Sequence, residues 1–206
     1  MFNKFPDIIP IFPLSGVIYF PNSNLPLNIF EKRYLDLVKD AIKKDKLMGM
    51  VQSKKTDNQV YRIGCLGKID DYRSSPDGRV LINLMGLTRF EILDEIDNKR
   101  LYREFKVSYE KFSLDSKPSI EEINMNTILD KSKVFFKNNG LLLNWKEFEK
   151  LDEFQKINTL AMIAPISNEE KQKLLESVTT IEKIKNFESI INFYLRGINF
   201  SNQTVQ

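Results

Sequence analysis

The 206-residue sequence contains no histidine and only one cysteine, Cys65. Without histidine there can be no Ser-His or Cys-His nucleophile pair, no imidazole acid–base chemistry and no His-ligated metal site. A single cysteine cannot form an internal disulfide or supply a thiolate metal cluster. Cys65 lies between Gly64 and Leu66 in a predicted strand, so we expect it to be a small core residue. We therefore expect no catalytic residue, no metal and no cofactor.

A strong excess of either charge is also lacking. The chain has 31 Lys and Arg against 28 Asp and Glu, which gives a net charge of +3. This bias is too weak to indicate a nucleic-acid partner by itself. The hydrophobic share of 42% is ordinary for a globular protein, and the length suits one large domain or two small ones.

Residues 8–30 contain no charged side chain, which raises the question of a membrane span. Pro10, Pro13, Pro21 and Pro26 argue against one, because each proline removes a backbone donor and would disturb a spanning helix. The first seven residues also lack the pattern of a signal peptide. We therefore expect a cytoplasmic location and no membrane partner.

The first half of the chain has the patterns of a β-rich domain. Extended segments are predicted for 8–14, 17–20 and 25–29, and a helix begins near Phe30, where apolar residues change to helical spacing. Ser75-Pro76-Asp77-Gly78 is a strong turn signal, so 66–72 and 79–85 should form a hairpin. Gly86 is expected to end that second strand.

The second half of the chain has helical patterns, and its helices are predicted from four capping-box pairs. The pairs are Ser119 with Glu122, Asn144 with Glu147, Ser167 with Glu170, and Thr179 with Glu182. The second pair should open one long helix to Ala164, and Gly197 should close the last. We thus expect an α+β protein with a β-rich subdomain over 1–113 and a helical subdomain over 114–206.

Several possible sites have a simpler structural explanation. Residues 64–69 contain two glycines and Lys68, but their spacing is not that of a P-loop. Adjacent acidic residues such as Asp70 and Asp71 point to opposite faces of a strand, so they cannot converge on a metal. A Ser-Lys dyad is not excluded by composition, although no pair stands out. Trp145 and the leucines 141–143 could be bundle core or an exposed docking patch.

The opening stretch resembles the amino-terminal, substrate-binding domain of Lon proteases. The similarity rests on residue types and spacing, which match in Pro10-Ile11-Phe12-Pro13-Leu14-x-Gly16-Val17, Phe20-Pro21 and Leu25-Pro26-Leu27-x-Ile29-Phe30-Glu31-x-Arg33-Tyr34. Shorter matches follow at Leu47-x-Gly49-Met50-Val51, Gly64-x-x-Gly67-x-Ile69, Gly86-x-x-Arg89-Phe90-x-Ile92 and Glu170-Lys171-Gln172-x-Leu174-Leu175-Glu176. The resemblance covers most of the chain and is weakest over 111–150.

This resemblance implies a PUA-like β-barrel followed by a helical subdomain, in a stand-alone protein that lacks the ATPase and peptidase domains of full-length Lon. The implied function is non-catalytic binding of unfolded or apolar peptide segments, or of a protein partner, linked to ATP-dependent proteolysis. The motif residues that we consider for ligand binding are Glu31, Arg33, Tyr34, Arg89 and Phe90. The alternative is a PUA-like module that binds RNA or a nucleotide-like molecule, although nucleic acid is the less favoured partner.

Overall fold

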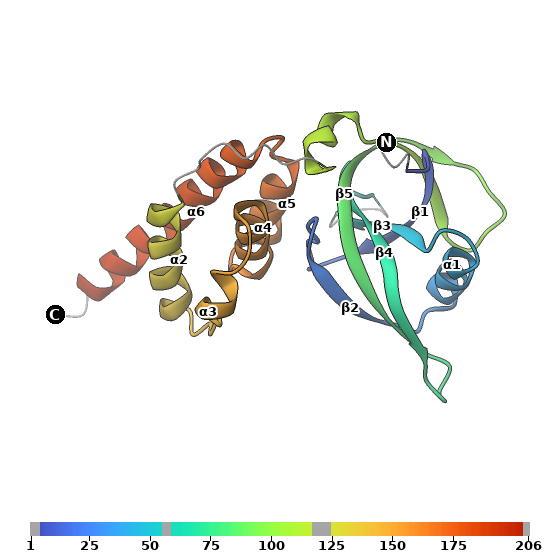
Figure 1. The fold of residues 1–206 in the computed structure, drawn as a ribbon, viewed down its shortest axis with the longest axis horizontal. Coiled ribbons are helices and arrows are strands. Elements are labelled where there is room, and N and C mark those ends of the chain that lie inside the picture. Colours follow the sequence, from blue (N-terminus) through green and yellow to red (C-terminus); the bar gives the residue numbers. More distant parts are fainter. Residues whose placement is uncertain (1–4, 55–58, 117–124, 204–206) are drawn as a thin grey trace. The chain divides into compact units, whose positions relative to one another are not determined.

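The computed structural model describes residues 5–54, 59–116 and 125–203, with side chains as far as Gly197. The chain divides into two compact units, Met1–Lys117 and Pro118–Gln206. The first unit is built mainly of strands and the second of helices, so the expected α+β plan is confirmed (Figure 1). The boundary expected after residue 113 falls inside a short helix of the first unit.

The first unit is a sheet that closes on itself. Its elements are β1 (Ile8–Leu14), β2 (Asn24–Ile29), α1 (Lys32–Ile42), β3 (Leu47–Gln52), β4 (Ile63–Ser74), β5 (Val80–Ile96), β6 (Arg103–Ser108) and the 3₁₀ segment η1 (Glu110–Ser116). The strand order is β2-β5-β4-β3-β1-β6, and β5 also pairs with β6. That last pairing closes β5, β4, β3, β1 and β6 into a barrel, and leaves β2 paired with β5 alone (Figure 1).

The strand β5 makes closure possible because it is 17 residues long and has different partners along its length. Its first part, Val80–Met85, pairs with β2, and its last part, Glu91–Ile96, pairs with β6. The expected hairpin between β4 and β5 is confirmed, and Gly78 at its turn has φ of +86°. A left-handed backbone conformation of this kind favours glycine.

Gly86 lies inside β5, so the prediction that it ends the strand is wrong. A Cβ at this position would lie 2.3 Å from the carbonyl oxygen of Phe20. The glycine instead lets a neighbouring loop approach, since its amide donates to the Ser23 carbonyl and its carbonyl accepts from the Asn22 amide. The close packing of loop and strand is thus what requires glycine here.

Residues 17–20 do not form the predicted strand. Ile18, Tyr19 and Phe20 are buried, and the Tyr19 hydroxyl donates to the Leu84 carbonyl at 2.7 Å. The apolar and β-branched character of this segment therefore reflects side-chain packing rather than a place in the sheet. Cys65 is buried, as expected.

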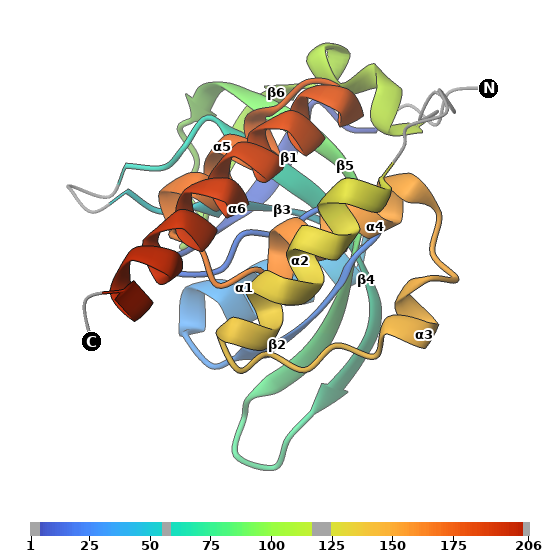
Figure 2. The same cartoon turned by 90° about the vertical axis from the view of Figure 1, so that its left-hand side faces the viewer.

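Over its described residues, 125–203, the second unit has the helices α2 (Asn126–Asn138), α3 (Trp145–Phe148), α4 (Glu153–Ile163), α5 (Asn168–Glu176) and α6 (Thr180–Gln203). The longest, α6, packs against α2, α4 and α5 (Figure 2). Within the described ranges, no helix is both long enough and apolar enough to cross a bilayer.

Three of the four predicted helix starts have the expected caps. The Ser167 hydroxyl accepts from the Glu170 amide and the Glu170 carboxylate accepts from the Ser167 amide, which is a complete capping box. Asn144 and Thr179 accept from the amides of the residues three positions later. The pair at 119 and 122 lies outside the described residues.

Two helix boundaries differ from the prediction. The long helix expected from Asn144 to Ala164 is two helices, because Asp152 forms a second capping box with Gln155 and opens α4. Gly197 does not end α6, which continues to Gln203. One glycine in an exposed helix position costs only about 1 kcal/mol relative to alanine, which is too little to end the helix by itself.

Candidate functional site

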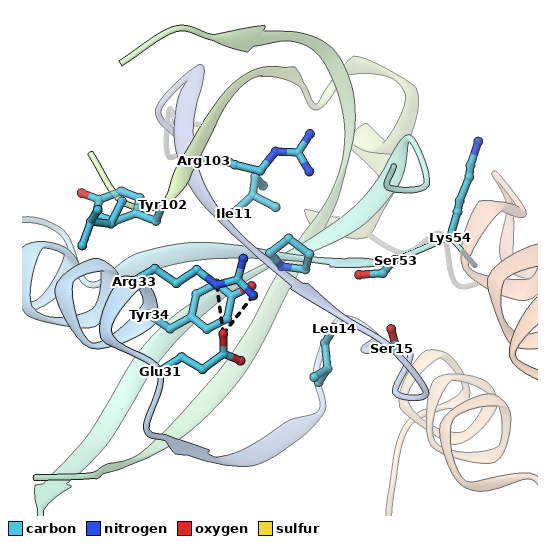
Figure 3. A pocket seen from close by; sticks show the side chains of 12 residues that line it. Ile11, Leu14, Ser15, Glu31, Arg33, Tyr34, Ser53, Lys54, Tyr102 and Arg103 are labelled. Atoms are coloured by element: carbon cyan, nitrogen blue, oxygen red, sulfur yellow. Dashed lines mark hydrogen bonds and ion pairs between the residues drawn. The ribbon is translucent and has the colours of Figure 1, made fainter. Parts of the chain in front are cut away.

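A groove of about 410 Å³ opens on the barrel unit, between the end of β1, the start of α1, the residues after β3 and the entrance to β6 (Figure 3). Apolar, hydroxyl and charged side chains line it together. The lining residues are Ile11, Pro13, Leu14, Ser15, Glu31, Arg33, Tyr34, Ser53, Lys54, Leu101, Tyr102 and Arg103.

The start of α1 supplies one wall. Arg33 donates through Nε to the Glu31 carboxylate at 3.0 Å, and its Nη2 lies 2.9 Å from the same oxygen (Figure 3). The guanidinium carbon stands 4.5 Å from the centre of the Tyr34 ring, which packs on Phe12 at 4.3 Å. Because Glu31 makes no side-chain cap bond, its carboxylate is held by Arg33 rather than by the helix.

Burial raises the pKa of Tyr34 above its ordinary value of 10, although the nearby Arg33 guanidinium opposes this effect. The phenol therefore remains protonated at neutral pH. A protonated hydroxyl can donate a hydrogen bond to a carbonyl or carboxylate oxygen. This wall of the groove thus combines an aromatic face with a neutral donor.

The start of β6 supplies the opposite wall. Arg103 donates through Nε and Nη2 to the two carboxylate oxygens of Glu95, each at 2.7 Å. These bonds lower the pKa of Glu95, so the carboxylate is charged at neutral pH. Both lining arginines thus have a carboxylate partner, and much of the positive charge of the groove is neutralised where it stands.

A polar network fixes the rim beside β6. The Tyr102 hydroxyl donates to Asp40 of α1 at 2.9 Å, and Arg100 contacts both the same carboxylate and the same hydroxyl. Burial of its ring raises the pKa of Tyr102, and the hydrogen bond to Asp40 adds to this effect. The network ties the residues before β6 to α1 and so positions Leu101, which is 57% exposed, at the mouth of the groove.

The backbone at the floor of the groove offers little for an added strand. The pairing of β1 with β6 stops at Ile11, whereas its pairing with β3 continues to Leu14. The Leu14 carbonyl accepts from Ser53 on the β3 side. Since backbone groups alternate in direction along a strand, Pro13 faces the open side, and proline has no N–H to donate. Recognition in this groove must therefore depend mainly on side chains.

Comparison with known proteins identifies the family. Residues 8–192 match the family model described as "ATP-dependent protease La (LON) substrate-binding domain". The chain belongs to this family. The expectation drawn from the opening motif is confirmed.

Similar curated proteins are much longer than this Lon substrate-binding domain chain. It is 25% identical over 206 residues to the Lon protease of Syntrophus aciditrophicus, covering 93% of this chain and 26% of the relative. It is also 25% identical to the Lon protease of Dictyoglomus thermophilum, covering 92% of this chain and 24% of the relative. The chain thus spans about a quarter of the length of these proteins.

Solved structures support the fold of the Lon substrate-binding domain. A Lon N-terminal domain protein from Xanthomonas campestris matches with a TM-score of 0.67 and 21% identity, over 88% of this chain and 97% of that one. The N-terminal domain of a Mycobacterium avium complex Lon protease matches with a TM-score of 0.64 and 14% identity, over 90% and 98%. At these identities the similarity establishes the fold alone.

The five Lon motif residues considered for ligand binding fall into two groups. Glu31, Arg33 and Tyr34 lie together in the groove. Arg89 and Phe90 are at most 1% exposed and line no part of it. Arg89 donates to Asp115 of η1 at 2.7 and 2.9 Å, and the Phe90 ring fills the space over Gly49 and Gly64. Both residues therefore stabilise the core of the barrel and are not accessible to a ligand.

Part of the groove gave no signal in the sequence of this Lon domain. Leu101, Tyr102 and Arg103 are some 70 residues from the opening motif and reach it only because β6 closes the barrel onto β1. The described residues contain no group of carboxylate or thiol side chains able to hold a metal ion.

Proposed function

We propose that the groove of this Lon-family chain binds exposed apolar side chains of unfolded proteins or of a protein partner. The chain itself performs no catalysis, and it acts in the cytoplasm beside ATP-dependent proteolysis. One observation carries the proposal. The family's motif residues Glu31, Arg33 and Tyr34 line a groove whose other side chains include the exposed Leu101 and the half-buried Leu14.

The size and lining of the groove suit part of a peptide. A volume of about 410 Å³ lies within the usual range of ligand pockets, roughly 300–1,000 Å³, and would take one or two large side chains. Leu14 and Leu101 supply apolar contact, while the Tyr34 hydroxyl can donate to a peptide carbonyl. Because Pro13 disfavours strand addition, the peptide would be selected by its side chains rather than by its backbone.

Fluorescence anisotropy tests this proposal with a labelled unstructured peptide that carries central Phe and Leu residues, and with a Ser-substituted version. Leu101→Ser should weaken binding of the apolar peptide about tenfold, because a leucine side chain at the mouth loses its contact. Leu93→Ser is the matched control, since Leu93 is 42% exposed on β5 and does not line the groove. Equal affinity for both peptides, or equal loss in both variants, would refute the proposal.

The alternative partner, RNA or a nucleotide, requires free positive charge in the groove. Arg33 and Arg103 are both paired with carboxylates. Among the described lining residues this leaves Lys54 as a cation without a carboxylate partner, and its ammonium stands over the Tyr61 ring. The charge distribution therefore favours peptide. If single-stranded RNA bound in a salt-dependent way and Lys54→Gln abolished that binding, RNA would replace the peptide as the favoured partner.

A further inference from the structure

The end of α2 carries the sequence Asn138-Asn139-Gly140, and Asn139 is the only asparagine in the chain that a glycine follows. A backbone nitrogen can attack the side-chain amide carbon of the asparagine before it and form a five-membered succinimide ring. Glycine hinders this attack least, because it has no Cβ. By sequence, Asn139 is therefore the asparagine most open to deamidation.

Backbone hydrogen bonds hold the Gly140 nitrogen away from this reaction. The Gly140 amide donates to the Lys137 carbonyl at 3.1 Å, and the Leu141 amide donates to the Phe136 carbonyl at 2.9 Å. Gly140 has φ of +68°, so the turn is a Schellman motif. While the turn is closed, the hydrogen of the attacking nitrogen is held in a bond to a carbonyl oxygen.

The same turn also holds the Asn139 side chain. Its Nδ2 donates to the Phe135 carbonyl at 2.8 Å and so helps to satisfy the carbonyl groups at the end of α2. The amide group that would leave as ammonia is thus bonded to the helix. Ring closure requires the bonds at Gly140 and at Asn139 to break, so the closed turn protects this asparagine.

The turn and the loop after it lie at the surface of the helical unit, between α2 and α3 (Figure 2). Residues 138–140 are exposed, Leu142 is 101% exposed and Leu141 is 38% exposed. Of the two interpretations that the sequence left open, bundle core is therefore wrong for these two leucines, while Trp145 is half-buried. A segment held by backbone bonds with little side-chain burial opens at a low free energy.

We propose that Asn139 is a site of spontaneous deamidation, and that the reaction makes the opening of this turn permanent. In the open turn the Gly140 nitrogen gives its proton to the solvent and bonds to Cγ of Asn139. The bond from Cγ to the amide nitrogen breaks, and that nitrogen takes up a proton and leaves as ammonia. Water then hydrolyses the succinimide at either carbonyl, which gives aspartate or isoaspartate at position 139. Solvent water is the only co-reactant.

The product cannot restore the closed turn. A carboxylate has no hydrogen to donate to the Phe135 carbonyl, whereas the Asn139 amide had one. It also places a negative charge at the C-terminal end of α2, where the helix dipole is negative. In the isoaspartate form an extra methylene in the main chain shifts Gly140 relative to Lys137. The end of α2 therefore remains more open after the reaction than before it.

Peptide mapping by mass spectrometry tests the proposal on the whole chain, kept in mildly alkaline buffer. Asn139 should convert about tenfold more slowly in native buffer than in urea, because the turn must first open. Lys137→Gly should speed the native reaction about fivefold, since glycine weakens the last turn of α2 and leaves both reacting residues in place. Lys173→Gly makes the same change in the last turn of α5 and should leave the rate unchanged.

Hydrogen exchange of the whole chain tests the consequence. Asn139→Asp reproduces one product, so the amides of Gly140 and Leu141 should exchange about fivefold faster. Asn138→Asp is the matched control, because it adds the same charge one residue earlier and keeps the Asn139 bond to Phe135, and its effect should be smaller. Equal conversion of Asn139 in native buffer and in urea would overturn the proposal, as would equal exchange in the two aspartate variants.

Discussion

The two units of the molecule are stabilised in different ways. In the barrel, β5 pairs with three strands, and the Tyr19 hydroxyl bonds to a carbonyl 65 residues away. In the helical unit, capping boxes at Asp152 and Ser167 join residues three positions apart. The barrel thus depends on long-range contacts that form together, whereas each helix start is stabilised locally. A substitution in the barrel core should therefore lower the unfolding free energy of the whole barrel. A substitution in a helix cap should destabilise mainly the helix that it begins.

The largest effect should come from the buried ion pair of the barrel. Arg89 and Asp115 have side chains only 2% and 1% exposed, and the guanidinium carbon stands 4.2 Å from the centre of the Phe112 ring. Asp115→Asn leaves a buried cation without its carboxylate, so we expect the barrel to lose about 3–5 kcal/mol of unfolding free energy. Urea unfolding followed by the near-UV circular dichroism of the tyrosines measures this loss, because six of the seven tyrosines lie in the barrel unit.

The control is the double variant Arg89→Met with Asp115→Leu. It removes both charges and should be less destabilised than Asp115→Asn. Trp145 fluorescence reports on the helical unit, and its midpoint in urea should barely change in any of these variants. A Trp145 transition that shifts as much as the circular dichroism would show that the two units unfold together, and the contrast drawn above would fail.

Alkaline pH should also act on the barrel first. Burial raises the pKa of Tyr19, Tyr102 and Tyr109 above 10 in the folded barrel. A raised folded-state pKa means that this stability is present below pH 10 and is lost as pH rises, because the unfolded chain ionises first. At pH 11 each fully protected tyrosine would cost the barrel about 1.4 kcal/mol.

The helical unit should respond to alkali with the opposite sign at one position. Partial burial lowers the pKa of Lys171 below 10.5. The unfolded chain then holds that proton more tightly, so the contribution of Lys171 to stability improves as pH rises towards 10.5. Burial raises the pKa of Tyr194 in the same unit, so its contribution to stability is lost above pH 10 and opposes that of Lys171. Urea titrations between pH 8 and 11 should therefore show the barrel midpoint falling more than the Trp145 midpoint. A parallel fall of both would contradict the prediction.

The same contrast explains what could be read from the sequence. The hairpin turn at 75–78 and the cap of Ser167 by Glu170 were predicted because a few neighbouring residues determine them. The continuity of β5 through Gly86 was missed, since it depends on a loop some 65 residues earlier in the chain. Val17–Phe20 has the residue types of a strand and yet forms none, because buried side-chain packing and strand formation favour the same residue types.

The site was predicted in part for the same reason. The motif supplied Glu31, Arg33 and Tyr34, which are close in sequence and in space. It also supplied Arg89 and Phe90, which lie in the core, because a family motif includes positions needed for packing as well as positions exposed to a ligand. Tyr102 and Arg103 join the groove only through barrel closure, and no local pattern marks that.

A matched pair of glycine substitutions should give a smaller effect, of opposite sign in the two units. Gly86→Ala would place a Cβ 2.3 Å from a backbone oxygen, so the barrel should lose about 1–3 kcal/mol as the loop is displaced. Gly197→Ala meets no atom within 4 Å inside α6 and should stabilise the helix by roughly 0.5–1 kcal/mol. Thermal unfolding of both variants measures the two signs. Stabilisation by both would show that the loop near Phe20 yields freely.

The smallest effect should come from single helix caps. Ser167→Ala removes a hydroxyl that accepts from the Glu170 amide, and we expect a loss of about 1 kcal/mol, confined to the helical unit. Glu31→Ala is the matched change at the start of α1, where the side chain makes no cap bond, so it should alter stability much less. Hydrogen exchange of the first turn of each helix distinguishes the two. Equal protection loss at both helices would mean that Glu31 supports α1 through its pair with Arg33. Loss at α5 alone would leave Glu31 free to act in the groove.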